Sequence, residues 1–333
     1  MGRSNLIGLC LFALCIALAP VALGNTLYQF IPLGALALMA IGLSLLMGYA
    51  GQISLGQSAF YAVGAYTSAL CSAKLGWSPW VTIPLSAVLA AGVALLVGMP
   101  SLRLRGHYLA MATLAFGEIV RIVLDGWITL TGGSSGIRGG APLTVGWPGS
   151  QPLVVFNTLT NERAVFYLVW TVAFLGLVLA LNLIHSRVGR ALRAIHDGEE
   201  AAVVLGVPTA RYKIQIFVLS AVYASLAGSL YAHSFSYLTP DEFGSAKSIL
   251  LVVMVVVGGM RTVWGAVVGT LLMGSLTEWL SWMENYWLVV YGVVLLVITM
   301  FVPQGILLGA GDFSRWLYRK IVRKKQSGEI KAS

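Results

Sequence analysis

Charged residues are scarce in this sequence. Only 10% of its 333 residues are Asp, Glu, Lys or Arg, whereas a soluble domain carries about a quarter. Hydrophobic residues make up 58%, and they recur in runs close to the roughly 20 apolar residues that a helix needs to cross a bilayer. These proportions exclude a water-soluble fold, and continuous rather than alternating apolarity favours helices over a barrel.

Cysteine is also rare. Cys10, Cys15 and Cys71 all lie inside apolar stretches, with no CxxC pattern and no histidine at ligand spacing. We interpret them as packing residues rather than as a disulfide or a metal site.

The dipeptide Gly-Lys is absent from the sequence. A P-loop needs that lysine beside its glycines to hold phosphates, so the glycine-rich stretch 132–140 is not a nucleotide site. We therefore expect no ATPase site, no catalytic residue, no cofactor and no metal on this chain.

The apolar runs predict an all-α fold, a polytopic transmembrane helix bundle of about eight to ten spanning helices with one short cytoplasmic helix. The runs cover residues 6–23, 31–48, 53–73, 81–99, 108–128, 165–184, 214–233, 249–260, 263–282 and 287–308. The run 249–260 is short for a full crossing, so 249–282 is either one bent span or two elements that turn near Gly258, Gly259 and Arg261. Gly265 and Gly269 form a GxxxG pattern, which predicts tight helix contact.

The net charge of +9 comes from Lys and Arg beside the apolar runs and in the tail. This distribution follows the positive-inside rule and does not indicate nucleic-acid binding. It predicts a bacterial inner-membrane protein with both termini in the cytoplasm, a transmembrane domain over 1–312 and a basic cytoplasmic tail over 313–333. Placing that tail inside favours two elements over 249–282.

Two further segments have open interpretations. The first run follows Arg3 and ends near a possible cleavage site at Gly24, but its length favours an uncleaved anchor over a signal peptide. The external loop 129–163 is rich in Gly and Pro and nearly uncharged, which suits either contact with a soluble partner or a flexible connection.

The cytoplasmic loop 185–212 contains a predicted short helix over 199–205. Asp197 is placed to cap it, Glu199 and Glu200 suit its first turn, and Gly206 and Pro208 end it. Such a short helix is unstable alone in water, so it must dock on something. Ahead of it, Arg190 and Arg193 share a helix face that can grip acidic groups, although simple topological anchoring is the alternative.

Polar residues interrupt the second and third runs. Gln52, Ser54 and Gln57 lie among the glycines Gly48, Gly51 and Gly56, an arrangement that lipid would not tolerate. They line a solute path or serve as polar packing between helices, and the sequence leaves both readings open. Farther on, Glu118 shares a helical face with Arg121 and Asp125, so it is a path candidate or one half of a satisfied ion pair.

These motifs resemble, in order, those of the branched-chain amino-acid ABC permeases, the LivH/LivM family, and the LivM branch in particular. The resemblance covers roughly residues 48–309. It is carried by Gly48-Tyr-Ala-Gly-Gln-Ile-Ser-Leu-Gly-Gln57, Gly64-Ala-Tyr66, Leu102-Arg-Leu-Arg-Gly106, Thr113-Leu with Glu118, Thr131-Gly-Gly, Gly136-Ile, Gly189-Arg-Ala-Leu-Arg-Ala-Ile, Glu199, Ala201-Ala202, Gly206, and Gly258-Gly259 with Gly265.

The resemblance implies that the short cytoplasmic helix fits a groove on a separate ATPase, which binds ATP and Mg. The coupling residues would be Arg187, Gly189, Arg190, Arg193, Asp197, Glu199, Glu200, Ala202 and Gly206. The path candidates would be Gly51, Gln52, Ser54, Gly56, Gln57 and Glu118. His196 and Arg261 depart from the family pattern, which usually has Arg and Gly there.

The expected function is that of a permease subunit of an ATP-driven importer of branched-chain or related hydrophobic amino acids. Its expected partners are ABC ATPase subunits, a second LivH-like permease or a copy of itself, a periplasmic binding protein and the lipid bilayer. The alternatives are the same permease class carrying urea, short amides or sugars, or an ion-coupled secondary transporter.

Overall fold

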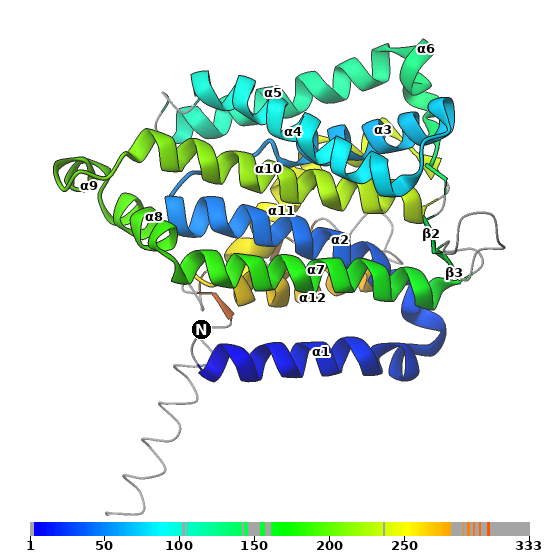
Figure 1. Cartoon of the computed structure of the whole chain (residues 1–333), viewed down its shortest axis with the longest axis horizontal. Helices are drawn as coiled ribbons and strands as arrows, with labels where there is room; N and C mark the ends of the chain where they lie inside the picture. The colour runs from blue at the N-terminus through cyan, green and yellow to red at the C-terminus, as the bar shows by residue number, and fades with distance from the viewer. Residues whose placement is uncertain are drawn as a thin grey trace, which may run out of the picture.

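A computed structural model describes residues 3–101, 104, 106–141, 143–145, 154–156, 161–235 and 237–280, with isolated positions between 289 and 306. Its long helices run side by side across Figure 1, which confirms the predicted helical bundle. They are α1 (Arg3–Leu23), α2 (Leu27–Ser44), α3 (Gln57–Leu75), α4 (Pro79–Ser101), α5 (His107–Gly126), α7 (Glu162–His185), α10 (Thr209–Ser234), α11 (Ser245–Gly258) and α12 (Val263–Leu280).

Helix α2 forms the centre of the bundle. Almost every residue from Leu33 onward is buried, and the helix contacts α7, α10, α11 and α12. In Figure 1 it lies between α10 and α7. A five-residue π-helix, η2 (Leu45–Tyr49), extends it. A helix that is apolar on all sides needs apolar surroundings, and here neighbouring helices supply them, since 89% of its most apolar window is buried inside the protein.

Four helices of the described residues are long and apolar enough to cross a membrane: α2 with η2, α4, α7 and α10. The bent pair α11 and α12 makes a fifth if it counts as one span. Helices α1, α3 and α5 lie alongside them in Figure 1. A polytopic membrane protein is confirmed, while the number of crossings, eight to ten, stays a prediction. The last predicted span, 287–308, and the tail 313–333 lie outside the continuously described residues.

The segment 249–282, described as far as residue 280, contains two helices, α11 and α12, and whether this bent pair crosses the membrane once or twice stays a prediction. Helices α11 and α12 meet at an angle of 116° across a break of a few residues. They pack very closely, because a Cβ at Gly258 would lie 1.8 Å from the carbonyl oxygen of Gly265 and one at Gly269 would lie 1.9 Å from that of Met254. The GxxxG prediction of tight contact is confirmed.

Several loops meet at one end of the bundle, which we call the coupling end. The Tyr49 hydroxyl donates to the Arg261 carbonyl at 3.0 Å, a Cβ at Gly48 would lie 1.8 Å from the Met260 carbonyl oxygen, and one at Gly51 would lie 3.0 Å from Nδ1 of His196. The short helices α8 (Arg187–Asp197) and α9 (Glu199–Val204) project there. The predicted cytoplasmic segments therefore share one end, as far as they are described.

The opposite, far end carries the loop after α5. It contains α6 (Ile128–Thr131), η3 (Gly133–Ser135) and short strands, with β1 (Ile137–Arg138) paired to β4 (Tyr237–Leu238) and β2 (Leu143–Val145) paired to β3 (Val154–Phe156). Nδ1 of buried His233 donates to the Ala141 carbonyl at 2.6 Å, and its Nε2 contacts the Ser68 hydroxyl at 2.7 Å. The described part of this loop is thus fastened to the bundle.

Helix α1 packs on the rest of the bundle through Phe12. Its ring contacts those of Trp170 and Trp264, with centroids 6.0 and 5.9 Å apart. The Tyr167 hydroxyl also donates to the Ala17 carbonyl at 3.1 Å. These contacts join α1 to α7 and α12, and its interpretation as an uncleaved anchor stays a prediction.

Candidate functional site

The chain leaves the helical conformation between η2 and α3, inside the bundle. Gly51 takes a φ of +66°, which favours glycine, and residues 51–56 form an irregular segment without regular secondary structure before α3 begins at Gln57. The predicted helix start at residue 53 is therefore wrong. The backbone N–H groups of Leu55 and Ser58 donate to the hydroxyls of Thr113 at 3.0 Å and Ser248 at 2.9 Å. Hydroxyl groups of α5 and α11 thus stabilise irregular backbone where water is scarce.

Three polar path candidates lie at this break in the helix, Gln52 and Ser54 on the irregular segment and Gln57 at the first position of α3. Nε2 of Gln57 donates to the Ser220 hydroxyl at 2.7 Å, and Ser54 is fully buried. Among the described residues neither amide atom of Gln52 has a hydrogen-bond partner, nor does Oε1 of Gln57. Gly56 is needed for close approach, since a Cβ there would lie 2.6 Å from the Thr113 carbonyl oxygen. Buried amides without partners suit a solute or water path better than packing alone.

Glu118 does not join this group. Its carboxylate pairs with Arg121 at 2.6 Å, and Arg121 lies 3.7 Å from Asp241 as well. The ion-pair interpretation of Glu118 is therefore the one that the geometry favours.

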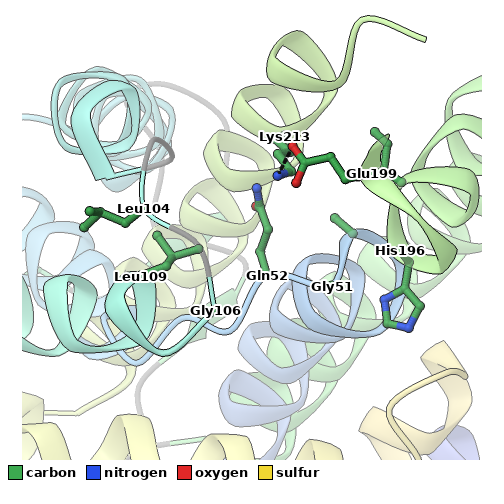
Figure 2. Close-up of a pocket in the computed structure, with 10 residues that line it drawn as sticks. Gly51, Gln52, Leu104, Gly106, Leu109, His196, Glu199 and Lys213 are labelled. Carbon is green, nitrogen blue, oxygen red and sulfur yellow. Dashed lines mark ion pairs between the residues drawn. The ribbon is translucent and has the colours of Figure 1, made fainter. Parts of the chain in front are cut away.

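A cavity of about 140 Å³ opens at the coupling end, between the irregular segment 51–56 and the predicted cytoplasmic loop. Figure 2 shows the Gln52 amide pointing toward the ion pair of Glu199 and Lys213, whose charged atoms lie 2.5 Å apart. The predicted path segment and the predicted coupling helix thus meet at this cavity. It is lined by Ala50, Gly51, Gln52, Leu104, Gly106, Leu109, Ile195, His196, Glu199 and Lys213.

Helix α9 begins and ends close to the predicted bounds. Gly206, with a φ of +80°, follows its last turn, and the N–H groups of Gly206 and Val207 donate to the carbonyls of Val203 and Ala202 at 2.9 and 3.0 Å. These two hydrogen bonds form a Schellman motif, a common way for a helix to end. The predicted cap is wrong, because Gly198 occupies the N-cap without any side-chain bond while Asp197 ends α8.

One face of the loop formed by α8 and α9 packs against the bundle. Gly189 and Ala202 are buried, whereas Arg187, Arg190 and Glu200 are exposed. The Arg193 guanidinium donates to the carbonyls of Ile184 at 3.0 Å and Gly189 at 3.2 Å. Arg193 therefore holds the corner between α7 and α8 rather than reaching outward.

Comparison with known proteins identifies the family. The model for the branched-chain amino acid transport system, permease component, matches residues 22–299. The chain belongs to this permease family. The permease is 32% identical over 286 residues to the high-affinity branched-chain amino acid transport system permease protein LivM of Escherichia coli (strain K12), an alignment covering 81% of this chain and 67% of that protein.

Two other relatives are more distant. LivH of the same strain is 27% identical over 284 residues, covering 81% of the permease and 90% of LivH. The ribose import permease protein RbsC of that strain is 25% identical over 271 residues, covering 78% and 80%. No solved structure matches the permease.

Family membership gives the coarse function. The protein is the multi-pass membrane component of an ABC transporter, a non-catalytic subunit of a family without cofactors. The hypothesis of an ion-coupled secondary transporter is set aside. Within the described part of the permease, His, Cys, Asp and Glu form no group of three or more that could hold a metal ion.

Two features of the coupling end were not predicted from the sequence. Val203, Val204 and Leu205 are 55%, 87% and 80% exposed, and they form an apolar tip on α9 of the permease. Lys213, on α10, pairs with Glu199. A Val-Val-Leu run inside an otherwise polar loop was the available signal for the tip, but nothing local links Lys213 to Glu199.

The ion pair is expected to connect α9 to the bundle. The Lys213 side chain is only 13% exposed and Glu199 is 30% exposed, so their attraction is stronger than at an open surface. We expect Glu199→Gln and Lys213→Met each to lower ATP-driven uptake severalfold. The double variant should retain as much uptake as the more impaired of the two single variants, because both remove the same interaction. Uptake by reconstituted vesicles measures this.

Arg211→Gln is the matched control, because Arg211 is an exposed charge in the same turn of α10. It should leave uptake unchanged. Independent, multiplicative losses in the double variant would contradict a shared interaction.

Proposed function

We propose that this permease moves branched-chain or related hydrophobic amino acids across the bacterial inner membrane, powered by ATP hydrolysis on a separate subunit. The cargo assignment rests on the similarity to LivM and LivH, whose names specify branched-chain amino acids. Coupling to ATP rests on one observation: α9 stands at the end of the bundle with an apolar tip exposed to water. Such a tip suits a protein partner, because exposed apolar clusters mark docking surfaces.

In this proposal the coupling end faces the cytoplasm, as do both termini. Residues Arg187, Arg190, Asp197 and Glu200 then surround the apolar tip and contact the ATPase, which binds ATP and Mg. The irregular segment with Gln52 and Ser54, together with Gln57 at the start of α3, forms part of the solute path. A second permease, LivH-like or identical, completes the membrane unit, and a periplasmic binding protein delivers cargo to the far end.

The decisive experiment is reconstitution. The permease with a LivH-like partner, ATPase and binding protein should take up labelled leucine into vesicles only when ATP is present on the ATPase side. Leucine uptake without the ATPase would contradict the coupling role of α9. Uptake of a sugar but not of leucine would contradict the cargo assignment.

A sugar is the second candidate cargo, favoured by the similarity to RbsC at 25% identity. Ribose is therefore the comparison solute in the same vesicles. We expect leucine to be taken up and ribose to be excluded.

A further inference from the structure

One carboxylate is partly buried among aromatic rings in the half of the bundle toward the far end. After β4, the 3₁₀ helix η4 (Pro240–Phe243) brings the chain back against α3. Phe243 is 1% exposed, and its ring centroid lies 5.1 Å from that of Tyr61 and 5.6 Å from that of Tyr66. Glu242, the residue before it, is therefore held beside these two tyrosines of α3.

The polar atoms of this pocket are incompletely paired. Tyr231 belongs to the same cluster of rings, because its ring centroid lies 5.8 Å from that of Tyr61. Among the described residues the Oε2 atom of Glu242 has no hydrogen-bond partner, and neither does the hydroxyl of Tyr66, a residue that is only 3% exposed. Buried polar atoms are almost always paired, so two orphans in one pocket point to a missing ligand.

The Arg121 guanidinium is already paired with other carboxylates. It lies 2.6 Å from Glu118 and 3.7 Å from Asp241. A cation that reaches the free oxygen of Glu242 would therefore gain an interaction that Arg121 does not supply.

A row of aromatic rings leads to this pocket from the surface of the far end. Tyr28 is 46% exposed, and its ring lies 5.8 Å from Phe235, which in turn lies 4.5 Å from Tyr231. Tyr231 is 5.8 Å from Tyr61. Aromatic faces attract cations and also pack against aliphatic groups, so this row of rings suits a solute that has both a positive charge and an aliphatic side chain.

Apolar space adjoins the same pocket. Tyr66 also lines a cavity of about 330 Å³ between α3, α4 and α5, together with Val63, Leu70, Val120 and Leu124. The surroundings of Glu242 therefore combine a carboxylate, aromatic faces and an aliphatic cavity.

We propose that Glu242, Tyr61, Tyr66 and Tyr231, here called the Glu242 pocket, bind the ammonium group of the solute as it passes through the permease. The carboxylate accepts hydrogen bonds from the ammonium and the rings surround its charge, while the aliphatic side chain of the solute occupies the adjoining cavity. This inference rests on the proposed amino-acid cargo and specifies which residues recognise its positive end. A neutral sugar would gain nothing from that charge.

Glu242→Gln tests the proposal in the full complex, because glutamine keeps the size of the side chain and one acceptor oxygen while it removes the negative charge. At saturating binding protein we expect leucine uptake to fall at least tenfold, the effect of losing one charge-assisted hydrogen bond. Glu242→Asp should retain more uptake than Glu242→Gln. ATP hydrolysis stimulated by the binding protein should continue, and Glu162→Gln, an exposed acid at the start of α7, should behave as wild type.

The outcomes separate this pocket from the proposed function. If the wild-type complex takes up ribose and not leucine, both the cargo assignment and the proposed role of the Glu242 pocket are contradicted. If wild type takes up leucine and Glu242→Gln does so equally well, only the pocket is overturned. If Glu242→Gln does not assemble, Tyr66→Phe decides: it removes only the orphan hydroxyl, and unchanged leucine uptake would overturn the pocket, whereas a severalfold loss supports it.

Discussion

Replacing Val204 and Leu205 by glutamate is expected to abolish ATP-driven uptake while leaving the permease folded. Both side chains are at least 80% exposed, so the change disturbs no internal packing. In an ATPase groove they would be desolvated, and burying an unpaired carboxylate there costs several kcal/mol. A cost of about 3 kcal/mol corresponds to roughly 100-fold weaker association. Co-purification of the ATPase and vesicle uptake of leucine should both be lost.

The matched control is Ala210→Glu, which adds the same charge at an exposed position at the start of α10 on the same end of the bundle. It should retain ATPase binding and uptake. If the Val204 and Leu205 variant bound its ATPase normally, α9 would not be the docking element.

Gly258→Val is expected to destabilise the permease strongly. A Cβ at this position would lie 1.8 Å from the Gly265 carbonyl oxygen and 2.9 Å from the Gly269 Cα. Both neighbours are backbone atoms and cannot rotate away, so α11 and α12 would have to separate. Overpacking of this kind costs roughly 3 kcal/mol or more, which should lower the apparent Tm in detergent by roughly 6 °C or more. Size-exclusion chromatography of heated samples measures it.

Gly92→Val provides the comparison, because a Cβ at Gly92 on α4 meets no atom within 4 Å. That variant should elute and melt like the wild type. Equal stability of the two variants would mean that the close contact between α11 and α12 does not contribute to folding.

Much of the helical framework could be predicted from periodicity and length alone. Predicted spans such as 81–99 and 165–184 correspond to α4 and α7 within a few residues, because a run of apolar residues in a membrane has no alternative to a helix. The short helix after Gly198 was also predictable, since Gly206 marks its end through a conformation that other residues rarely adopt.

The errors arose where contacts between distant segments decide the conformation. The stretch 53–56 was predicted to belong to a spanning helix, yet it is irregular, and the hydroxyls of Thr113 and Ser248 accept hydrogen bonds from the backbone N–H groups of Leu55 and Ser58. Asp197 has the right spacing for a cap, but it ends α8 instead. Local preferences are small, and packing of neighbouring helices overrides them.

The sequence by itself determined that this protein lies in a membrane, is helical, lacks its own ATPase site and carries a short helix in its main polar loop. Composition and spacing suffice for these conclusions because the bilayer admits so few backbone structures. The tertiary structure alone decided which polar groups meet. It joined Glu199 to Lys213, set Gln52 beside that pair, and placed Phe243, the neighbour of Glu242, against the rings of Tyr61 and Tyr66 on α3. Such pairings depend on how helices far apart in the chain pack, and no local pattern encodes them.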